Sequence, residues 1–155
     1  MLHPSNANFR VACIGECEYP PESFDLITSM DTMYFAKDMT RFVAQIKSWL
    51  KPDGILFVGY QEGDVIPRTQ NVQSAALSKA LHANRMPFQV IDITRQTYDL
   101  LIRKRQAALD HQAAFEKERL SEWFDLLMLQ TECICKPYEL FEKEMARYLY
   151  IARKK

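Results

Sequence analysis

Apolar residues along the chain form either short continuous runs, typical of buried strands, or stripes at helical spacing. Runs of strand length cover residues 9–15, 24–30 and 55–60. After Asp38, which is placed to cap a helix, apolar residues recur every three or four positions as far as Leu50. The sequence Lys-Pro-Asp-Gly at 51–54 then ends the helix. Strand, helix and strand in this order predict a right-handed parallel βαβ unit and therefore an α/β fold.

The second half of the chain is predicted to be mainly helical. Helical patterns lie at 72–84, 95–117, 121–131 and 137–145, with strands at 88–94 and 147–152. A length of 155 residues fits one compact domain. We therefore expect a single unit over residues 1–155, in which residues 95–146 form a helical insertion before the last strand.

The composition limits the partners that we expect. Apolar residues make up 48% of the chain and charged residues 26%, which is typical of a globular protein. Twenty basic residues balance twenty acidic ones, so the chain lacks the net positive charge that favours nucleic acid or anionic membranes. The first ten residues do not resemble a signal peptide, and no apolar stretch approaches the roughly 20 residues of a membrane span. We expect a cytoplasmic protein.

Residues that usually hold metals or phosphates are few and lack the usual spacing. The cysteines are Cys13, Cys17, Cys133 and Cys135, and the histidines are His3, His82 and His111. No C-x-x-C pair is present, so free thiols are expected. The histidines are isolated from acidic residues at ligand spacing, which argues against a metal site and against a Ser-His-Asp triad. The four glycines form neither a G-x-G-x-x-G motif nor a phosphate-binding loop.

Three ordered motifs resemble the second half of the class I S-adenosylmethionine-dependent methyltransferases. They are Ser23-Phe24-Asp25-Leu26-Ile27, Leu50-Lys51-Pro52-Asp53-Gly54 and Ile55-Leu56-Phe57-Val58. In that family, a proline-rich loop is followed by a strand, a helix, an LKPgG turn and a hydrophobic strand. The strand at 88–94 and the terminal strand at 148–151 resemble the family's last antiparallel pair. The resemblance implies a Rossmann-like sheet, whose complete strand order in the family is 3-2-1-4-5-7-6.

The family's first half has no counterpart in these 155 residues. The glycine-rich loop that holds the methionine end of the cofactor is absent, and so is the following strand with an acidic residue for the ribose. The run at 9–15 resembles the family's third strand instead. The chain thus resembles a methyltransferase sheet truncated in its N-terminal half, and we expect only weak binding of S-adenosylmethionine.

The resemblance also implies a set of site residues. Those on the cofactor side are Glu16, Cys17, Ser29 and Met30. Glu16 is placed to accept a hydrogen bond from the adenine amine, and its alternative is a solvated loop carboxylate. Asp31 and Tyr34 follow the strand at 24–30 and face the methyl acceptor, with Asp31 as a base or an amine-orienting group. The alternative for residues 29–31 is an ordinary turn between strand and helix.

The implied function is methyl transfer to a small molecule by in-line displacement, without a metal and weak or absent in the isolated chain. One alternative is a non-catalytic remnant that serves as an oligomerisation or regulatory module, and another is an enzyme completed by a second chain that carries the N-terminal half. The strand at 24–30 would have an open edge, which favours a homodimer. The aromatic residues of the insertion are expected in its core or in a substrate lid. They are Trp123, Phe124, Tyr138 and Phe141.

Overall fold

The computed structural model describes residues 7–9 and 11–155. Its main elements are β1 (Phe24–Met30), α1 (Met39–Trp49), β2 (Leu50–Glu62), α2 (Ala76–Ala83), β3 (Phe88–Asp92), α3 (Thr94–Asp110), α4 (Gln112–Lys117), α5 (Ser121–Gln130), α6 (Tyr138–Glu144) and β4 (Ala146–Arg153). Short 3-10 helices are η1 (Met33–Phe35), η2 (Val72–Ser74) and η3 (Glu132–Ile134). The α/β class is confirmed, as is the placing of helices before the last strand.

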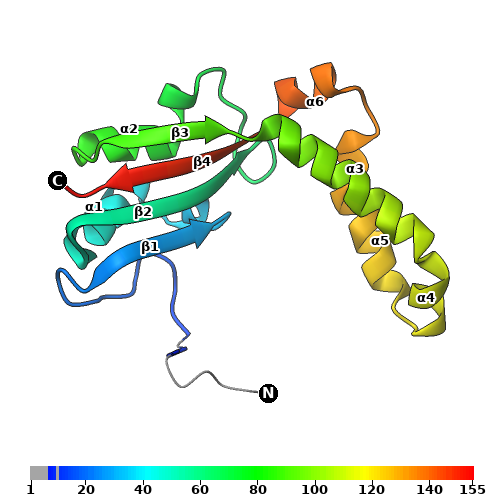
Figure 1. Ribbon diagram of the computed structural model, residues 1–155, viewed down its shortest axis with the longest axis horizontal. Coiled ribbons are helices and arrows are strands. Elements are labelled where there is room, and N and C mark those ends of the chain that lie inside the picture. Colours follow the sequence, from blue (N-terminus) through cyan, green and yellow to red (C-terminus); the bar gives the residue numbers. More distant parts are fainter. Residues whose placement is uncertain (1–6, 10) are drawn as a thin grey trace.

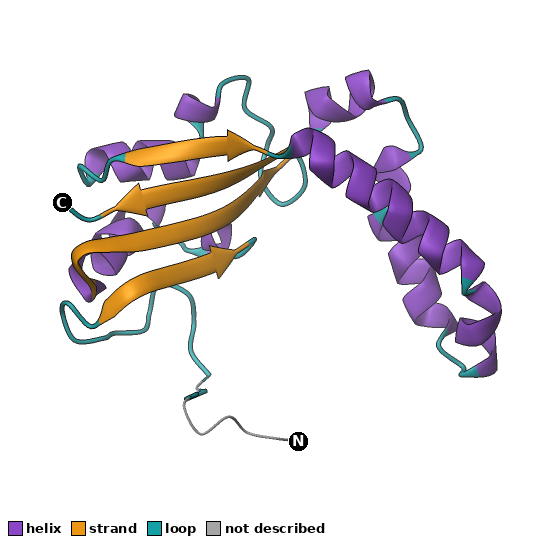
Figure 2. Ribbon diagram, in the orientation of Figure 1, coloured by secondary structure: helices purple, strands orange, loops and turns teal. Residues whose placement is uncertain are grey.

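The four strands form one sheet in the order β1-β2-β4-β3 (Figure 2). β1 and β2 run parallel, while β4 is antiparallel to both of its neighbours. If the strands are numbered as the fourth to seventh of the class I family, this order is 4-5-7-6, as the resemblance implies. The register places Gly59 opposite Met30 and Gln61 opposite Arg147. The carboxyl ends of β1 and β2 therefore meet the start of β4 at one edge of the sheet.

Helices α1 and α2 cover one face of the sheet, behind the strands in Figure 1. The Asp38 carboxylate caps α1 as predicted, because it accepts a hydrogen bond of 2.9 Å from the Arg41 backbone N–H. The buried stripe of α1 meets alternate side chains of the two central strands. These core residues are Val43, Ile46 and Trp49 from α1, Leu56, Val58 and Tyr60 from β2, and Tyr148, Tyr150 and Ala152 from β4.

The opposite face of the sheet is apolar and has no helix over it in the described part of the chain (Figure 1). Its half-buried side chains are Ile55, Phe57, Leu149 and Ile151. Leu26 and Met30 on β1 are more open, with 54% and 50% of their surface exposed. In addition, among the described strands β1 has a neighbour on only one side. Both the outer edge of β1 and this face are thus available to a further element.

Helices α3, α4 and α5 form an arm, residues 94–130, that projects away from the sheet (Figure 1). The helix predicted at 95–117 is divided at His111, which separates α3 from α4. Phe115 and Phe124 pack across the arm with ring centroids 6.0 Å apart. Of the helices described, none combines the length and apolarity required to cross a bilayer.

The prediction of a strand at residues 9–15 is wrong. Residues 9 and 11–15 do not form a strand, and residues 14–16 form a turn instead. Phe9 is 80% exposed. An apolar run becomes a strand only when a neighbouring strand pairs with its backbone, and no described strand lies beside this one. Arg10 and the N-terminal stretch 1–6, which include His3 and most of the segment searched for a signal peptide, lie outside the described residues.

Candidate functional site

A cavity of about 1150 Å³ opens at the edge where β1 and β2 end and β4 begins. Its sheet side is formed by Asp31, Tyr34, Gln61, Gly63, Asp64, Met145 and Arg147. The base of the arm and η3 form the opposite wall. The carboxyl ends of parallel strands are the usual ligand-binding edge of an open α/β sheet. This cavity therefore lies where such a fold places its chemistry.

Asp31 occupies an unusual backbone and side-chain position at this edge. Its φ angle of +54° lies in the left-handed region, and its N–H donates to the Gly59 carbonyl at 2.9 Å. Oδ2 forms an ion pair with the Arg147 guanidinium. Oδ1 is buried, yet it has no hydrogen-bond partner among the described residues. Strained backbone and unsatisfied buried acceptors are both uncommon and concentrate at functional sites.

Arg147, which the sequence reasoning missed, positions this carboxylate. It is the second residue of β4, and its backbone N–H donates to Thr94 Oγ1 at 3.0 Å. The ion pair joins residues 116 positions apart in the chain. No local pattern in the sequence indicates such a pairing, because it depends on the registers of β1 with β2 and of β2 with β4.

Tyr34 lines the same cavity, with its ring against that of Tyr60 at a centroid distance of 5.9 Å. Partial burial raises the pKa of the Tyr34 phenol, and the negative charges of Asp31 and Asp64 raise it further. The phenol thus stays protonated at neutral pH. It is suited to donate a hydrogen bond there, and not to act as a base.

The arm side of the cavity carries charges of both signs. Lys104 on α3 donates to Gln130 Oε1 at 2.9 Å, and Lys136 pairs with Glu144. Cys133 also lines this wall, and burial raises the pKa of its thiol, so the thiol is a poor nucleophile at neutral pH. Together with the Asp31 to Arg147 pair, this wall favours a neutral or zwitterionic ligand over a strongly charged one.

Glu16 and Cys17 lie apart from Asp31. Glu16 lines a separate cavity of about 420 Å³ between the 14–16 turn and the start of α1. Its exposed carboxylate pairs with Lys37 Nζ at 3.0 Å, and this contact lowers the pKa of Glu16. Cys17 is half-buried against the core. No residue lines both the Glu16 cavity and the large cavity.

Ser29 and Met30 precede Asp31 at the end of β1. Ser29 Oγ lies 2.7 Å from Thr32 Oγ1 in a side-chain hydrogen bond. Met30 lies on the open face above Gly59, where an added Cβ would come within 2.7 Å of Met30 Cε. Neither residue lines the large cavity. The structure thus brings Asp31 and Tyr34 into one cavity and leaves Ser29 and Met30 outside its lining, on opposite faces of β1.

Comparisons with known proteins agree with this geometry. A family model described as a methyltransferase domain matches residues 2–58, which include the motifs at the start of β1 and β2. A phosphoethanolamine N-methyltransferase 2 from Haemonchus contortus superposes with a TM-score of 0.74 at 16% identity, over 92% of this chain and 36% of that one. The chain has a class I methyltransferase fold.

Other solved structures share this methyltransferase fold. The cyclopropane synthase MmaA2 from Mycobacterium tuberculosis has a TM-score of 0.65 at 15% identity, over 86% of this chain and 56% of that one. The cyclase SpnF has a TM-score of 0.64 at 18% identity, over 95% and 55% of the two chains. No curated protein matches the sequence significantly. The named reactions differ, so the fold alone does not define the chemistry of this chain.

The methyltransferase-fold chain spans between about a third and just over half of the length of these structures. The Haemonchus contortus enzyme has been solved with S-adenosylhomocysteine and, in another structure, with S-adenosylmethionine.

A buried carboxylate supports the loop that follows β2 in this methyltransferase fold. Glu62 is 1% exposed and accepts hydrogen bonds from the Thr69 N–H at 2.9 Å and from Thr69 Oγ1 at 2.8 Å. Arg68 Nη1 lies 3.4 Å from the same carboxylate. Gly63 follows at a φ of +94°, where an added Cβ would overlap the Glu144 carbonyl oxygen. The loop that carries Asp64 into the large cavity is therefore held from both sides.

The insertion's aromatic residues mostly follow the core interpretation. Phe141 is buried against Tyr98 with ring centroids 5.1 Å apart, and the Tyr138 ring centroid lies 5.4 Å from that of Tyr98 and 6.4 Å from that of Phe141. Phe124 packs inside the arm, whereas Trp123 is 59% exposed. None of the predicted lid residues lines the large cavity. Within the residues that the structure covers, no three His, Cys, Asp or Glu side chains are grouped to hold a metal ion.

Proposed function

We propose that this chain takes part in S-adenosylmethionine-dependent methyl transfer to a small molecule whose amine or hydroxyl group lies at Asp31. The observation that carries the proposal is the Asp31 carboxylate itself. One oxygen is held by Arg147, while the other is buried without a donor beside a cavity of about 1150 Å³. A substrate N–H or O–H is the donor that this oxygen lacks.

The chain's residues fit part of the cofactor. Ser29 and Met30 lie at the carboxyl end of β1, where they would contact the methionine end, and Glu16 with Cys17 would contact the adenine. Glu16 is exposed, so its carboxylate can exchange the Lys37 contact for the adenine amine. When bound, the cofactor supplies an electrophilic methyl group on a positively charged sulfur. The 155 residues offer no glycine-rich loop for the remaining polar groups, so we expect weak binding by the chain alone.

Asp31 and Tyr34 have different roles toward the methyl acceptor. Asp31 orients the nucleophile by accepting its hydrogen bond and receives the proton that the nucleophile loses. Arg147 keeps the carboxylate in place, and the protonated Tyr34 phenol donates a hydrogen bond to a second acceptor atom. Most of the acceleration then comes from proximity and orientation, which can lower the activation barrier by about 7–11 kcal/mol in well-oriented cases.

The open side of the sheet supports a second part of the proposal. The unpaired edge of β1 and the apolar face around Phe57 would be covered by a second copy of the chain or by a complementing N-terminal half, and we favour the homodimer. The same feature supports the alternative function, a non-catalytic oligomerisation or regulatory module. We place the protein in the cytoplasm, since all four cysteines are free.

Binding of butylamine tests the role of Asp31 without the need for turnover. Calorimetry or NMR titration should show that Asp31→Asn weakens binding at least tenfold, because the variant loses the charged acceptor. Asp25→Asn is the matched control, since Asp25 is an exposed carboxylate at the opposite end of β1, paired with Lys51. Equal binding by wild type and Asp31→Asn would remove Asp31 from the acceptor site.

A further inference from the structure

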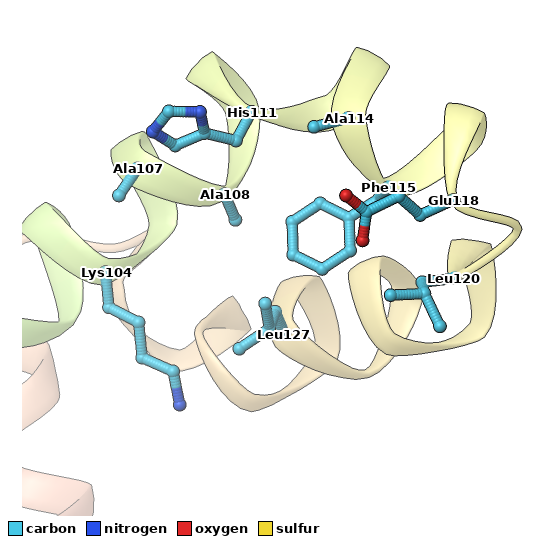
Figure 3. Close-up of a pocket in the computed structure, with 9 residues that line it drawn as sticks. All are labelled: Lys104, Ala107, Ala108, His111, Ala114, Phe115, Glu118, Leu120 and Leu127. Carbon is cyan, nitrogen blue, oxygen red and sulfur yellow. The ribbon is translucent and has the colours of Figure 1, made fainter.

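The arm contains a cavity of its own, of about 450 Å³, between α3, α4 and α5 (Figure 3). Its apolar lining consists of Ala107, Ala108, Ala114, Phe115, Leu120 and Leu127. Figure 3 shows Phe115 and Leu127 directed into the space between the helices, while the alanines leave room that larger side chains would fill. The other lining residues are the polar Lys104, His111 and Glu118.

The arm cavity adjoins the large cavity at Lys104. This lysine lines both of them. Leu101, one turn earlier on α3, lines the large cavity, and Ala107 and Ala108, one turn later, line the arm cavity. On α5, Leu129 lines the large cavity and Leu127 lines the arm cavity. Lys104, whose ammonium group donates to Gln130 Oε1, thus lies at the boundary between the two cavities.

We propose that the arm cavity holds the apolar tail of the methyl acceptor, whose nucleophilic head lies at Asp31. The inference rests on the proposed function for the head and adds the class of substrate, an amphiphile with a linear alkyl tail. A volume of about 450 Å³ is typical of small-molecule sites, which span about 300–1,000 Å³. An apolar cavity of about 150 Å³ accommodates benzene, so the arm has room for a tail of about ten carbons or more.

The chemistry of the two cavities fits the two ends of such a molecule. The large cavity offers an unsatisfied carboxylate oxygen and charges of both signs to a polar head. The arm cavity is lined by alanine, leucine and phenylalanine side chains, which favour the binding of apolar groups. The aliphatic stem of Lys104 can lie along the tail at the junction while its ammonium group remains at the rim.

A series of alkylamines tests the tail site. Butylamine, hexylamine, octylamine and decylamine are titrated by calorimetry below the concentrations at which they aggregate. Each added methylene that enters the cavity should lower Kd about fourfold. Ala107→Phe fills the cavity from an exposed position on α3 and should abolish this dependence on chain length. Ala113→Phe is the matched control, because Ala113 is exposed on α4 and does not line the cavity.

The outcomes separate the tail site from the head site. Loss of the chain-length dependence in Ala107→Phe but not in Ala113→Phe supports the tail site. A flat series in wild type overturns it, as does an unchanged slope in both Ala107→Phe and a second filling variant, Ala114→Leu. Circular dichroism shows whether each variant is folded. Asp31→Asn should weaken all four amines by the same factor, so a flat series that still depends on Asp31 overturns only the tail site.

Discussion

Replacement of Glu62 by alanine removes the acceptor that holds the loop between β2 and α2. The carboxylate is 1% exposed, and its contacts at 2.8–2.9 Å with Thr69 are joined by Arg68 at 3.4 Å. After the change, the Thr69 N–H and hydroxyl lose their acceptor in a partly buried position. Hydrogen bonds to a charged group contribute about 1.5–3 kcal/mol each, and the longer Arg68 contact contributes less. We expect Glu62→Ala to lower the free energy of unfolding by about 3 kcal/mol.

Glu62→Gln keeps the shape and one acceptor oxygen, so we expect a smaller loss of about 1–2 kcal/mol. A double-mutant cycle with Thr69→Val should return a coupling energy of about 1–2 kcal/mol, since the two side chains are in direct contact. Urea unfolding followed by circular dichroism measures the wild type and each variant, and the dependence of the unfolding free energy on urea should stay constant across them.

Asp25→Ala is the control for loss of a carboxylate that is paired but exposed, and it should cost about 1 kcal/mol or less. If Glu62→Ala is no more destabilising than Asp25→Ala, the carboxylate does not hold the loop. Because Gly63 and Asp64 follow Glu62 into the large cavity, we also expect Glu62→Ala to weaken butylamine binding.

Two further predictions concern the buried tyrosines. Tyr60 Oη is buried without a hydrogen-bond partner among the described residues, whereas Tyr150 Oη lies 3.0 Å from Ser78 Oγ. Tyr60→Phe should therefore leave the free energy of unfolding unchanged or raise it by about 1 kcal/mol, and Tyr150→Phe should lower it by about 1 kcal/mol. Urea unfolding measures both. Burial raises the pKa of Tyr60 to about 12 and also raises the pKa of Tyr150, while an unfolded tyrosine ionises near pH 10. The folded chain then binds more protons than the unfolded chain above about pH 10, so stability should be complete below pH 10 and decline towards pH 12, with a smaller decline in Tyr60→Phe. An equal decline in wild type and variant would exclude Tyr60 as a source.

Local sequence patterns predicted the elements that depend on neighbouring residues. The run at 24–30 became β1 with the same bounds, and the Asp38 cap with its apolar stripe marked α1. Both signals depend on residues that are close together in the sequence, so they can be recognised without knowledge of the fold. The order of β1, β2, β4 and β3 came from the family resemblance and not from the pattern.

The errors arose where contacts between distant residues decide the structure. The apolar run at 9–15 has the composition of a strand but lacks a neighbour to pair with. Asp31 was identified as a site residue, but Arg147 was not, because the ion pair joins the end of β1 to the start of β4. The local sequence likewise indicates only that Glu62 is the polar end of a strand. Its contact with Thr69 forms because the loop after β2 folds back. Register and loop closure set these pairs, and neither is encoded in local spacing.

Binding of S-adenosylhomocysteine by the 155-residue chain tests most directly whether this methyltransferase fold holds its cofactor only in part. The residues available are Glu16, Cys17, Ser29 and Met30, while the glycine-rich loop and the ribose-binding acid are absent from the sequence. Several polar groups of the ligand would therefore keep water as their partner. Calorimetric titration should give a Kd of about 1 mM or weaker. A Kd in the micromolar range would contradict this expectation and show that another segment of the chain completes the site.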